Sequence, residues 1–139
     1  MNVFLDSSAL AKRYVQESGS ARVDAILLAA SSLGISMVSV PEVVSALCRR
    51  RRERKLSQQQ YLKAKQALLN DLRDSSVVNV TDQVVARAVE LLERWPLRSS
   101  DSLHVASAAE WAADLFVSAD KTQCAAARGY GLRVEEIKL

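Results

Sequence analysis

The stretch NVFLDSS, residues 2–8, indicates the fold class of this chain. Its apolar part, Asn2–Leu5, has the composition of a short buried β-strand, and Asp6 follows it directly. A similar arrangement recurs near the other end of the sequence, where Asp120 comes shortly after the apolar run Leu115–Ser118. Because the carboxyl ends of parallel strands meet at one edge of a sheet, strands followed by acids predict a polar site at that edge.

Strand-like and helical segments alternate along the whole sequence. Strands are expected over Asn2–Leu5, Ile35–Val40, Val77–Val80, Leu115–Ser118 and Leu132–Glu135. Helices are expected over Ser8–Gln16, Ala21–Leu33, Glu42–Lys55, Ser57–Leu72, Thr81–Trp95, Ser102–Ala113 and Lys121–Arg128. This alternation predicts an α/β protein, a three-layer α/β/α sandwich around a central parallel sheet, and leaves the strand order open. A chain of 139 residues suits a single domain, which we expect to span residues 1–139.

Composition sets limits on location and partners. The two cysteines, Cys48 and Cys124, form no CxxC pattern and are expected to be reduced thiols. No apolar run reaches the roughly 20 residues that span a bilayer, and the first residues lack the features of a signal peptide. We therefore expect a cytoplasmic protein without a membrane partner. The net charge of +3 permits an anionic partner such as RNA.

Four acids are candidates for one metal site. Asp6 and Asp120 follow strand-like runs, Glu42 follows Val38-Ser39-Val40-Pro41, and Asp101 begins a helical segment. Carboxylates gathered in one crevice repel each other unless cations neutralise them, and an oxygen-only donor set suits Mg²⁺, with Mn²⁺ as a substitute. Such ions activate water for phosphodiester cleavage. Each acid taken alone also fits the ordinary role of capping a helix.

The residues around these acids resemble the PIN-domain family, and within it the VapC-type toxins of toxin–antitoxin systems. The quoted segments are, in order, Phe4–Tyr14, Val40–Val44, Arg98–Ala106 and Phe116–Lys121. The resemblance spans nearly the whole chain and places one acid in each segment. It implies a PIN-like fold, Mg²⁺-dependent endoribonuclease activity on RNA, a homodimer, and inhibition by a cognate antitoxin protein.

The resemblance also suggests roles for individual residues. Asp6 and Asp101 would hold the principal Mg²⁺, and Glu42 and Asp120 would complete the crevice through water or around a second ion. Beside them, four residues are candidates for support: Ser7, Ser8, Ser118 and His104. Either of the first two serines orients Asp6, bonds a phosphate or caps the first helix. Ser118 either orients Asp120 or is an ordinary polar residue at a strand end, and His104 either contacts the site or packs beside it as a structural residue.

The densest basic run is a candidate RNA contact. It comprises Arg49, Arg50, Arg51 and Arg52, followed by Arg54 and Lys55. Contacts to phosphates supply most of the non-specific affinity for nucleic acids. The alternative is a solvated helix end, where cations oppose the helix dipole.

Other functions fit the sequence less well or remain open. An aspartyl-phosphate phosphatase needs a second aspartate two residues after Asp6, where this chain has Ser8. A phosphate-receiver domain is disfavoured because the long helical region Glu42–Leu72 does not suit it. A degenerate PIN fold that binds RNA or protein without catalysis remains an alternative, as does a metal-dependent DNase, because nothing in the sequence reads the 2′-hydroxyl.

Overall fold

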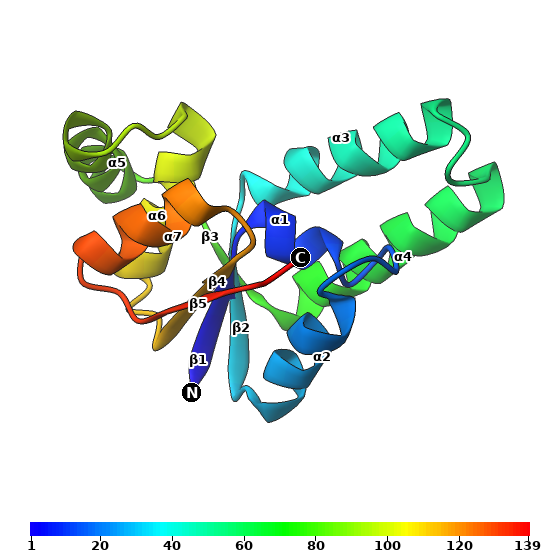
Figure 1. Ribbon diagram of the computed structural model, residues 1–139, viewed down its shortest axis with the longest axis horizontal. Coiled ribbons are helices and arrows are strands. Elements are labelled where there is room, and N and C mark those ends of the chain that lie inside the picture. Colours follow the sequence, from blue (N-terminus) through cyan, green and yellow to red (C-terminus); the bar gives the residue numbers. More distant parts are fainter.

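The computed structural model describes residues 1–139 and contains a central sheet of five parallel strands (Figure 1). The strands lie in the order β3-β2-β1-β4-β5. Their bounds are β1 Asn2–Leu5, β2 Ser32–Ser36, β3 Ser76–Val78, β4 Leu115–Ser118 and β5 Val134–Glu136. The first strand of the sequence is therefore the middle strand of the sheet. It pairs with β4 in the register Leu5↔Val117, which places the residues just beyond these two strands side by side.

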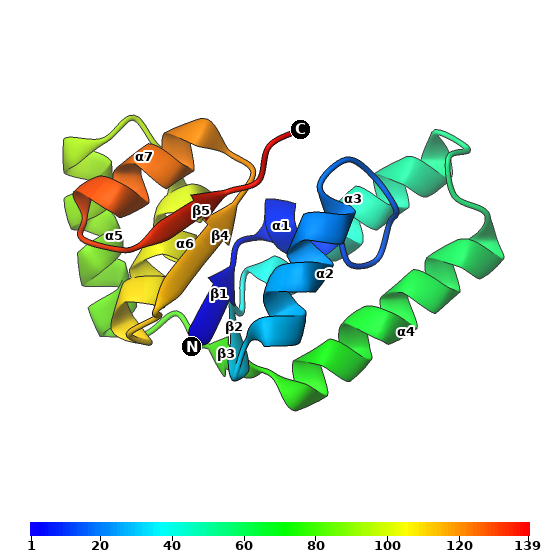
Figure 2. The same ribbon diagram turned by 60° about the horizontal axis from the view of Figure 1, so that its bottom comes forward.

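Helices cover both faces of the sheet, which confirms the predicted three-layer α/β/α arrangement (Figures 1 and 2). One layer contains α1 Ser7–Ala11, α2 Ser20–Ala29, α3 Ser39–Arg52 and α4 Gln58–Asp74. The other contains α5 Asp82–Arg94, α6 Ser99–Glu110 and α7 Lys121–Gly129. The helices α3 and α4 extend beyond the sheet as a pair (Figure 1). No helix combines the length and the apolar content that crossing a membrane requires.

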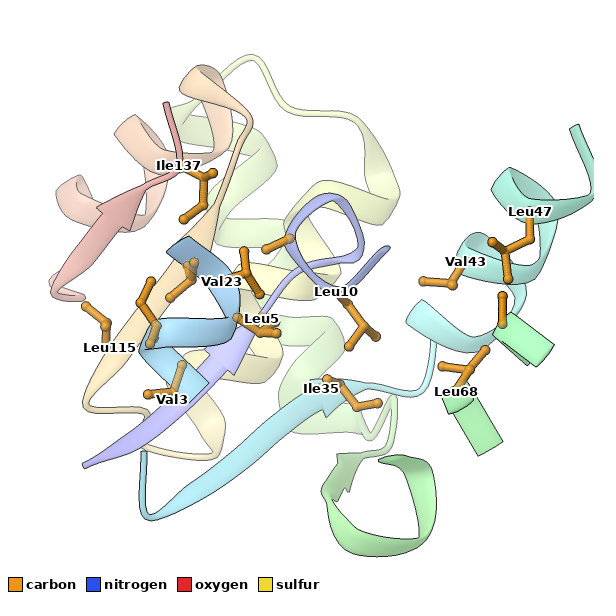
Figure 3. Packing of buried hydrophobic residues seen from close by; sticks show 14 of the residues in the cluster. Val3, Leu5, Leu10, Val23, Ile35, Val43, Leu47, Leu68, Leu115 and Ile137 are labelled. Carbon is orange, nitrogen blue, oxygen red and sulfur yellow. The ribbon is translucent and has the colours of Figure 1, made fainter. Parts of the chain in front are cut away.

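The alternation of side chains along β1 produces two hydrophobic cores. Val3 and Leu5 face the first helical layer and pack with residues of α1, α2, α3 and α4 (Figure 3). Phe4 faces the other way, stacks on Phe116 with ring centroids 6.0 Å apart, and packs with residues of α5, α6 and α7. Because successive strand residues point to opposite faces, a strand buried on both sides consists almost wholly of apolar residues.

The second strand and the helix after it both begin earlier than the sequence suggested. The strand is Ser32–Ser36 instead of Ile35–Val40, and the preceding helix ends at Ala29 instead of Leu33. Pro41 does not end the strand but lies in the first turn of α3, which begins at Ser39. Proline is tolerated there because the first N–H groups of a helix have no partner within it. The β-branched run was therefore misread: Met37 and Val38 form a turn, and its last two residues, Ser39 and Val40, are helical.

The first helix is also shorter than predicted, ending at Ala11 instead of Gln16. The chain turns after Lys12, whose side chain is buried and whose Nζ donates to the carbonyl oxygen of Ser18 at 2.7 Å. Gly19 then adopts a φ of 92° as the N-cap of α2, a left-handed conformation that suits glycine. A partly buried ion pair between Lys12 and Glu17 closes this turn, a tertiary feature that helical periodicity does not reveal.

The two cysteines are free thiols in different surroundings. Cys48 is half-buried on α3, whereas Cys124 on α7 is fully buried with its Sγ 3.6 Å from the carbonyl oxygen of Ser118. Burial is the main reason why the pKa of Cys124 rises to about 11. Since the thiolate is the reactive form, Cys124 is doubly protected.

Alkylation of the native protein by iodoacetamide at pH 8 should therefore modify Cys48 well before Cys124. Unfolding in urea should make both cysteines reactive, because it removes the burial that protects Cys124. Mass spectrometry of peptides from timed samples measures both rates. Equal rates in the native protein would contradict the burial of Cys124.

Candidate active site

All four predicted acids line a single pocket at the C-terminal edge of the sheet. This edge lies toward the top of Figure 1, where β1 leads into α1 and β4 leads toward α7. The pocket has a volume of about 90 Å³ and no hydrophobic residue lines it. Its lining consists of Asp6, Ser7, Ser8, Glu42, Arg98, Asp101, His104, Asp120 and Gln123. The structure thus brings together carboxylates from separate parts of the chain, while their chemical roles stay predictions.

Asp6 is the most buried of these acids, with 1% of its surface exposed. It is the N-cap of α1, and its Oδ1 accepts a hydrogen bond from the backbone N–H of Ala9 at 2.9 Å. The Ser8 hydroxyl also donates to this carboxylate, at 2.8 Å from Oδ1. Burial raises the pKa of Asp6 above its ordinary value, because desolvation disfavours the charged form more than His104 and these hydrogen bonds favour it. Asp6 therefore caps α1 and lines the pocket at the same time.

Ser118, at the end of β4, contacts the carboxylate of Asp6 and not that of Asp120, whose orientation was one of the two roles expected for this serine. Its hydroxyl donates to Asp6 Oδ2 at 2.5 Å and accepts a hydrogen bond from the backbone N–H of Asp120 at 3.0 Å. The register between β1 and β4 explains the correction, since Leu5 lies opposite Val117 and the following residues are neighbours. Ser118 therefore positions Asp6 across two strands that are distant in sequence.

Glu42 lies in the first turn of α3 and is held by a histidine and a serine. Its Oε1 is 2.6 Å from His104 Nε2, and the Ser7 hydroxyl donates to the same oxygen at 2.7 Å. His104 was expected either to contact the site or to pack beside it as a structural residue. It does both, because it is buried and also contacts Glu42. The hydrogen bond from His104 is the largest cause of the lowered pKa of Glu42, which falls to about 2. Glu42 is therefore ionised at neutral pH.

Asp101 and Asp120 lie at the starts of α6 and α7. Asp101 is in the first turn of α6, where Arg98 Nε donates to its Oδ2 at 3.1 Å. Asp120 is the N-cap of α7 and accepts a hydrogen bond from the backbone N–H of Gln123 at 3.0 Å. Both acids thus sit at helix N-termini, where the helix dipole favours negative charge.

Two residues of the pocket, Arg98 and Gln123, were not predicted from the sequence. Arg98 is largely exposed, and its ion pair with Asp101 follows from their i,i+3 spacing, which the sequence does display. Gln123 is buried, and its side-chain Nε2 donates to Asp101 Oδ1 at 3.3 Å. Its position three residues after Asp120 is the only sequence feature that could have indicated it, because the contact to Asp101 depends on how α6 and α7 pack.

The donor set suits a hard cation, although the side chains are not closed around one. The four carboxylates, the serine hydroxyls and the Gln123 amide present oxygen atoms, which Mg²⁺ and Mn²⁺ prefer. No group of three or more histidine, cysteine, aspartate or glutamate side chains is arranged to hold a metal ion. Several of the carboxylate oxygens instead accept hydrogen bonds from the protein, as Asp101 does from Arg98. A cation at this carboxylate would have to replace that contact.

The basic run on α3 divides into paired and unpaired arginines. Arg50 forms an ion pair with Glu17, and Arg51 donates to Gln58 at 2.8 Å while its guanidinium lies 4.4 Å from the ring centroid of Tyr61. Arg49 and Arg52 are exposed and have no ion pair in the structure. The run is therefore neither a uniform RNA-binding stripe nor a uniformly solvated helix end.

Comparison with known proteins identifies the family. The sequence pattern of the PIN domain matches residues 3–129. The chain belongs to the PIN domain family. Its members are typically nucleases, and those nucleases generally use divalent metal ions. No curated protein sequence matches the chain.

Solved structures of toxin–antitoxin proteins share this PIN fold. A toxin–antitoxin complex from Klebsiella pneumoniae superposes with a TM-score of 0.72 at 15% identity, covering 98% of both chains. A second match is VapC20 from Mycobacterium tuberculosis, described as a sarcin-ricin loop cleaving toxin. Its TM-score is 0.69 at 18% identity, and the match covers 89% of this chain and 94% of that one. VapBC2 from Rickettsia felis, bound to a DNA fragment from its promoter, has a TM-score of 0.70 at 15% identity. This match covers 99% of this chain and 100% of that one. At these identities the likeness establishes the fold.

Replacing Asp6 by asparagine should stabilise this PIN domain at neutral pH in the presence of a chelator. Because burial raises the pKa of Asp6 in the folded protein, ionisation of Asp6 opposes folding once the pH rises through that raised pKa. The stability difference between Asp6→Asn and the unchanged protein should vanish below about pH 3.8, where Asp6 is protonated in both states. Urea unfolding of both proteins at several pH values measures this difference in the free energy of unfolding. A less stable Asp6→Asn protein at pH 7 would show that the hydrogen bonds to Asp6 outweigh the cost of burying its charge.

Proposed function

We propose that this PIN domain is a Mg²⁺-dependent endoribonuclease and the toxin of a VapC-type toxin–antitoxin pair. The observation that carries the proposal is the convergence of Asp6, Glu42, Asp101 and Asp120 on one polar pocket of a chain that belongs to a family of nucleases. Four carboxylates in a pocket with no hydrophobic lining are costly unless a cation neutralises them. Catalysis of phosphodiester hydrolysis is a function that uses such a cation.

The carboxylates divide into two pairs in this proposal. Asp6 and Asp101 hold the principal Mg²⁺, for which Mn²⁺ can substitute, and Glu42 and Asp120 complete the site through water or around a second ion. When bound by these residues, the metal would lower the pKa of a water molecule and offset negative charge on the phosphate. In the reaction, the water oxygen forms a new bond to phosphorus and loses a proton, while the bond from phosphorus to the leaving oxygen breaks and that oxygen gains a proton. His104 and Ser7 keep Glu42 ionised and oriented, whereas Ser8 and Ser118 orient Asp6 and favour its charged form against the larger opposing effect of burial.

RNA is the proposed substrate, and exposed arginines on α3 are the proposed contacts to its backbone. Arg49 and Arg52 are exposed and free of ion pairs, whereas Arg50 and Arg51 are engaged within the protein. The same helix carries Glu42 in its first turn, so one element connects the pocket to these cations. Arg98, at the pocket itself, is a further exposed cation that a phosphate can reach.

The partners in this proposal are an antitoxin protein and a second copy of the chain. Support for the antitoxin comes from the names of proteins with the same fold, which describe toxin–antitoxin complexes. The homodimer rests on the family resemblance alone. A small neighbouring gene for a DNA-binding antitoxin would support the toxin assignment, and an isolated gene would weaken it. The location proposed for such a toxin is the cytoplasm, where its RNA substrate is.

Purified protein should cleave RNA in Mg²⁺ and not in chelator. The variants Asp6→Asn and Asp101→Asn should each lower the cleavage rate by more than about 100-fold, since loss of even an indirect metal partner typically costs 10–100-fold. Gel analysis of mixed RNA and of DNA of matched sequence measures cleavage, and circular dichroism verifies that the variants remain folded.

The controls separate this proposal from its alternatives. Asp114→Asn changes an aspartate outside the pocket, which accepts a hydrogen bond from the backbone of Asn2, and should leave cleavage intact. Equal cleavage by Asp6→Asn would mean that a contaminant is responsible. Binding of RNA without cleavage in any divalent metal would instead favour a degenerate PIN module, and preferential cleavage of DNA would favour a DNase.

Replacing both Arg49 and Arg52 by glutamine should weaken RNA binding and reduce its salt dependence. Each lost phosphate contact lowers the slope of log affinity against log salt by about 0.7 for single strands, so the double variant should lose about 1.4. Fluorescence anisotropy with inactive Asp6→Asn protein and labelled RNA at several salt concentrations measures this slope. The matched control, Lys65→Gln with Arg73→Gln on the exposed side of α4, removes the same charge elsewhere. An equal effect of the control would show that net charge, and not this segment of α3, determines binding.

A further inference from the structure

Two side chains of the pocket, Gln123 and His104, are almost completely buried and only half satisfied, and Gln123 is the one that carries an unpaired oxygen. Gln123 is 2% exposed, and its Nε2 donates to Asp101 Oδ1 at 3.3 Å, a long hydrogen bond. Its other polar atom, Oε1, is buried and has no hydrogen-bond partner. Buried polar groups are nearly always paired in proteins, so an unpaired amide oxygen beside a pocket of carboxylates requires an explanation.

The surroundings of Gln123 limit what its amide oxygen can bind. The backbone N–H of the same residue donates to Asp120 Oδ1, so the residue links the acids at the starts of α6 and α7. An amide oxygen carries partial negative charge and can accept only from a donor or a cation. Carboxylates offer neither when ionised. The group that would satisfy Gln123 Oε1 is therefore a hydrogen-bond donor, such as a water molecule, or a cation.

We propose that the Gln123 amide works in two orientations: it donates to Asp101 as in the structure, and it turns end for end to offer Oε1 to a divalent cation bound at Asp101. This inference rests on the proposed metal-dependent function and deepens it. The amide of glutamine has a donor at one end and an acceptor at the other, so a rotation about its last side-chain bond exchanges them in nearly the same volume. In the turned orientation, Oε1 lies beside Asp101 Oδ1, and both oxygens serve the cation directly or through a bound water. Gln123 is thus a neutral oxygen partner added to the four carboxylates.

Metal binding to three proteins tests this role without reference to catalysis. Isothermal titration with Mg²⁺ or Mn²⁺ should give about 10-fold weaker affinity for Gln123→Met, which keeps the shape of the side chain and removes both polar ends. Gln123→Glu, which has oxygen at both positions, should bind at least as tightly as the unchanged protein. Gln66→Met is the matched control, because Gln66 is exposed on α4 and contacts only Asn70 in the structure, and it should change nothing.

Nuclear magnetic resonance of the unchanged protein provides a second test that does not depend on how a variant folds. The side-chain NH₂ signals of Gln123, assigned by their absence in Gln123→Met, should shift on titration with Mg²⁺ with the same midpoint as the calorimetric binding curve. Unmoved signals at saturation, or full metal affinity in Gln123→Met, would overturn the inference while leaving metal binding by the carboxylates intact. Absence of any Mg²⁺ or Mn²⁺ binding by the unchanged protein would overturn the proposed function together with it.

Discussion

The burial of the Asp6 carboxylate at the end of the central strand is the constraint on which the pocket depends. A buried charge is unfavourable, and here three donors from two segments partly offset its cost: the backbone of Ala9 and the hydroxyl of Ser8 on α1, and the hydroxyl of Ser118 on β4. These donors also fix the carboxylate, since they approach both of its oxygens. Desolvation still dominates and keeps the pKa of Asp6 raised, so the site is organised around a charge that the protein alone does not fully stabilise.

The remaining acids are held by different means, which gives each a different character. Glu42 is paired with His104 and Ser7, and its pKa is low. Asp101 is bound between Arg98 and Gln123. Because every carboxylate has protein donors, the pocket can keep its shape while its negative charges lie close together. A cation that entered would exchange some of these hydrogen bonds for metal contacts, and the exposed guanidinium of Arg98 is the contact most easily released.

Much of this architecture was predictable because it depends on local composition. The strands β1 and β4 were predicted with their observed bounds, since a run of apolar residues followed by an acid needs no long-range information. The acids Asp6, Glu42, Asp101 and Asp120 could likewise be selected from the sequence, because their family resemblance and positions near strand ends or helix starts are visible there. The boundary between β2 and α3 could not, as Pro41 is equally compatible with a strand end and with the first turn of a helix.

The sequence by itself determined which residues form the layers and which acids are available at the edge of the sheet. Only the tertiary structure decided which side chains touch. Ser118 bonds Asp6 because β4 lies next to β1, a pairing between residues 112 positions apart. Gln123 reaches Asp101 because α7 packs beside α6. Local patterns report the periodicity and propensity of single segments, whereas the order of strands and the packing of helices depend on the free energy of the whole chain.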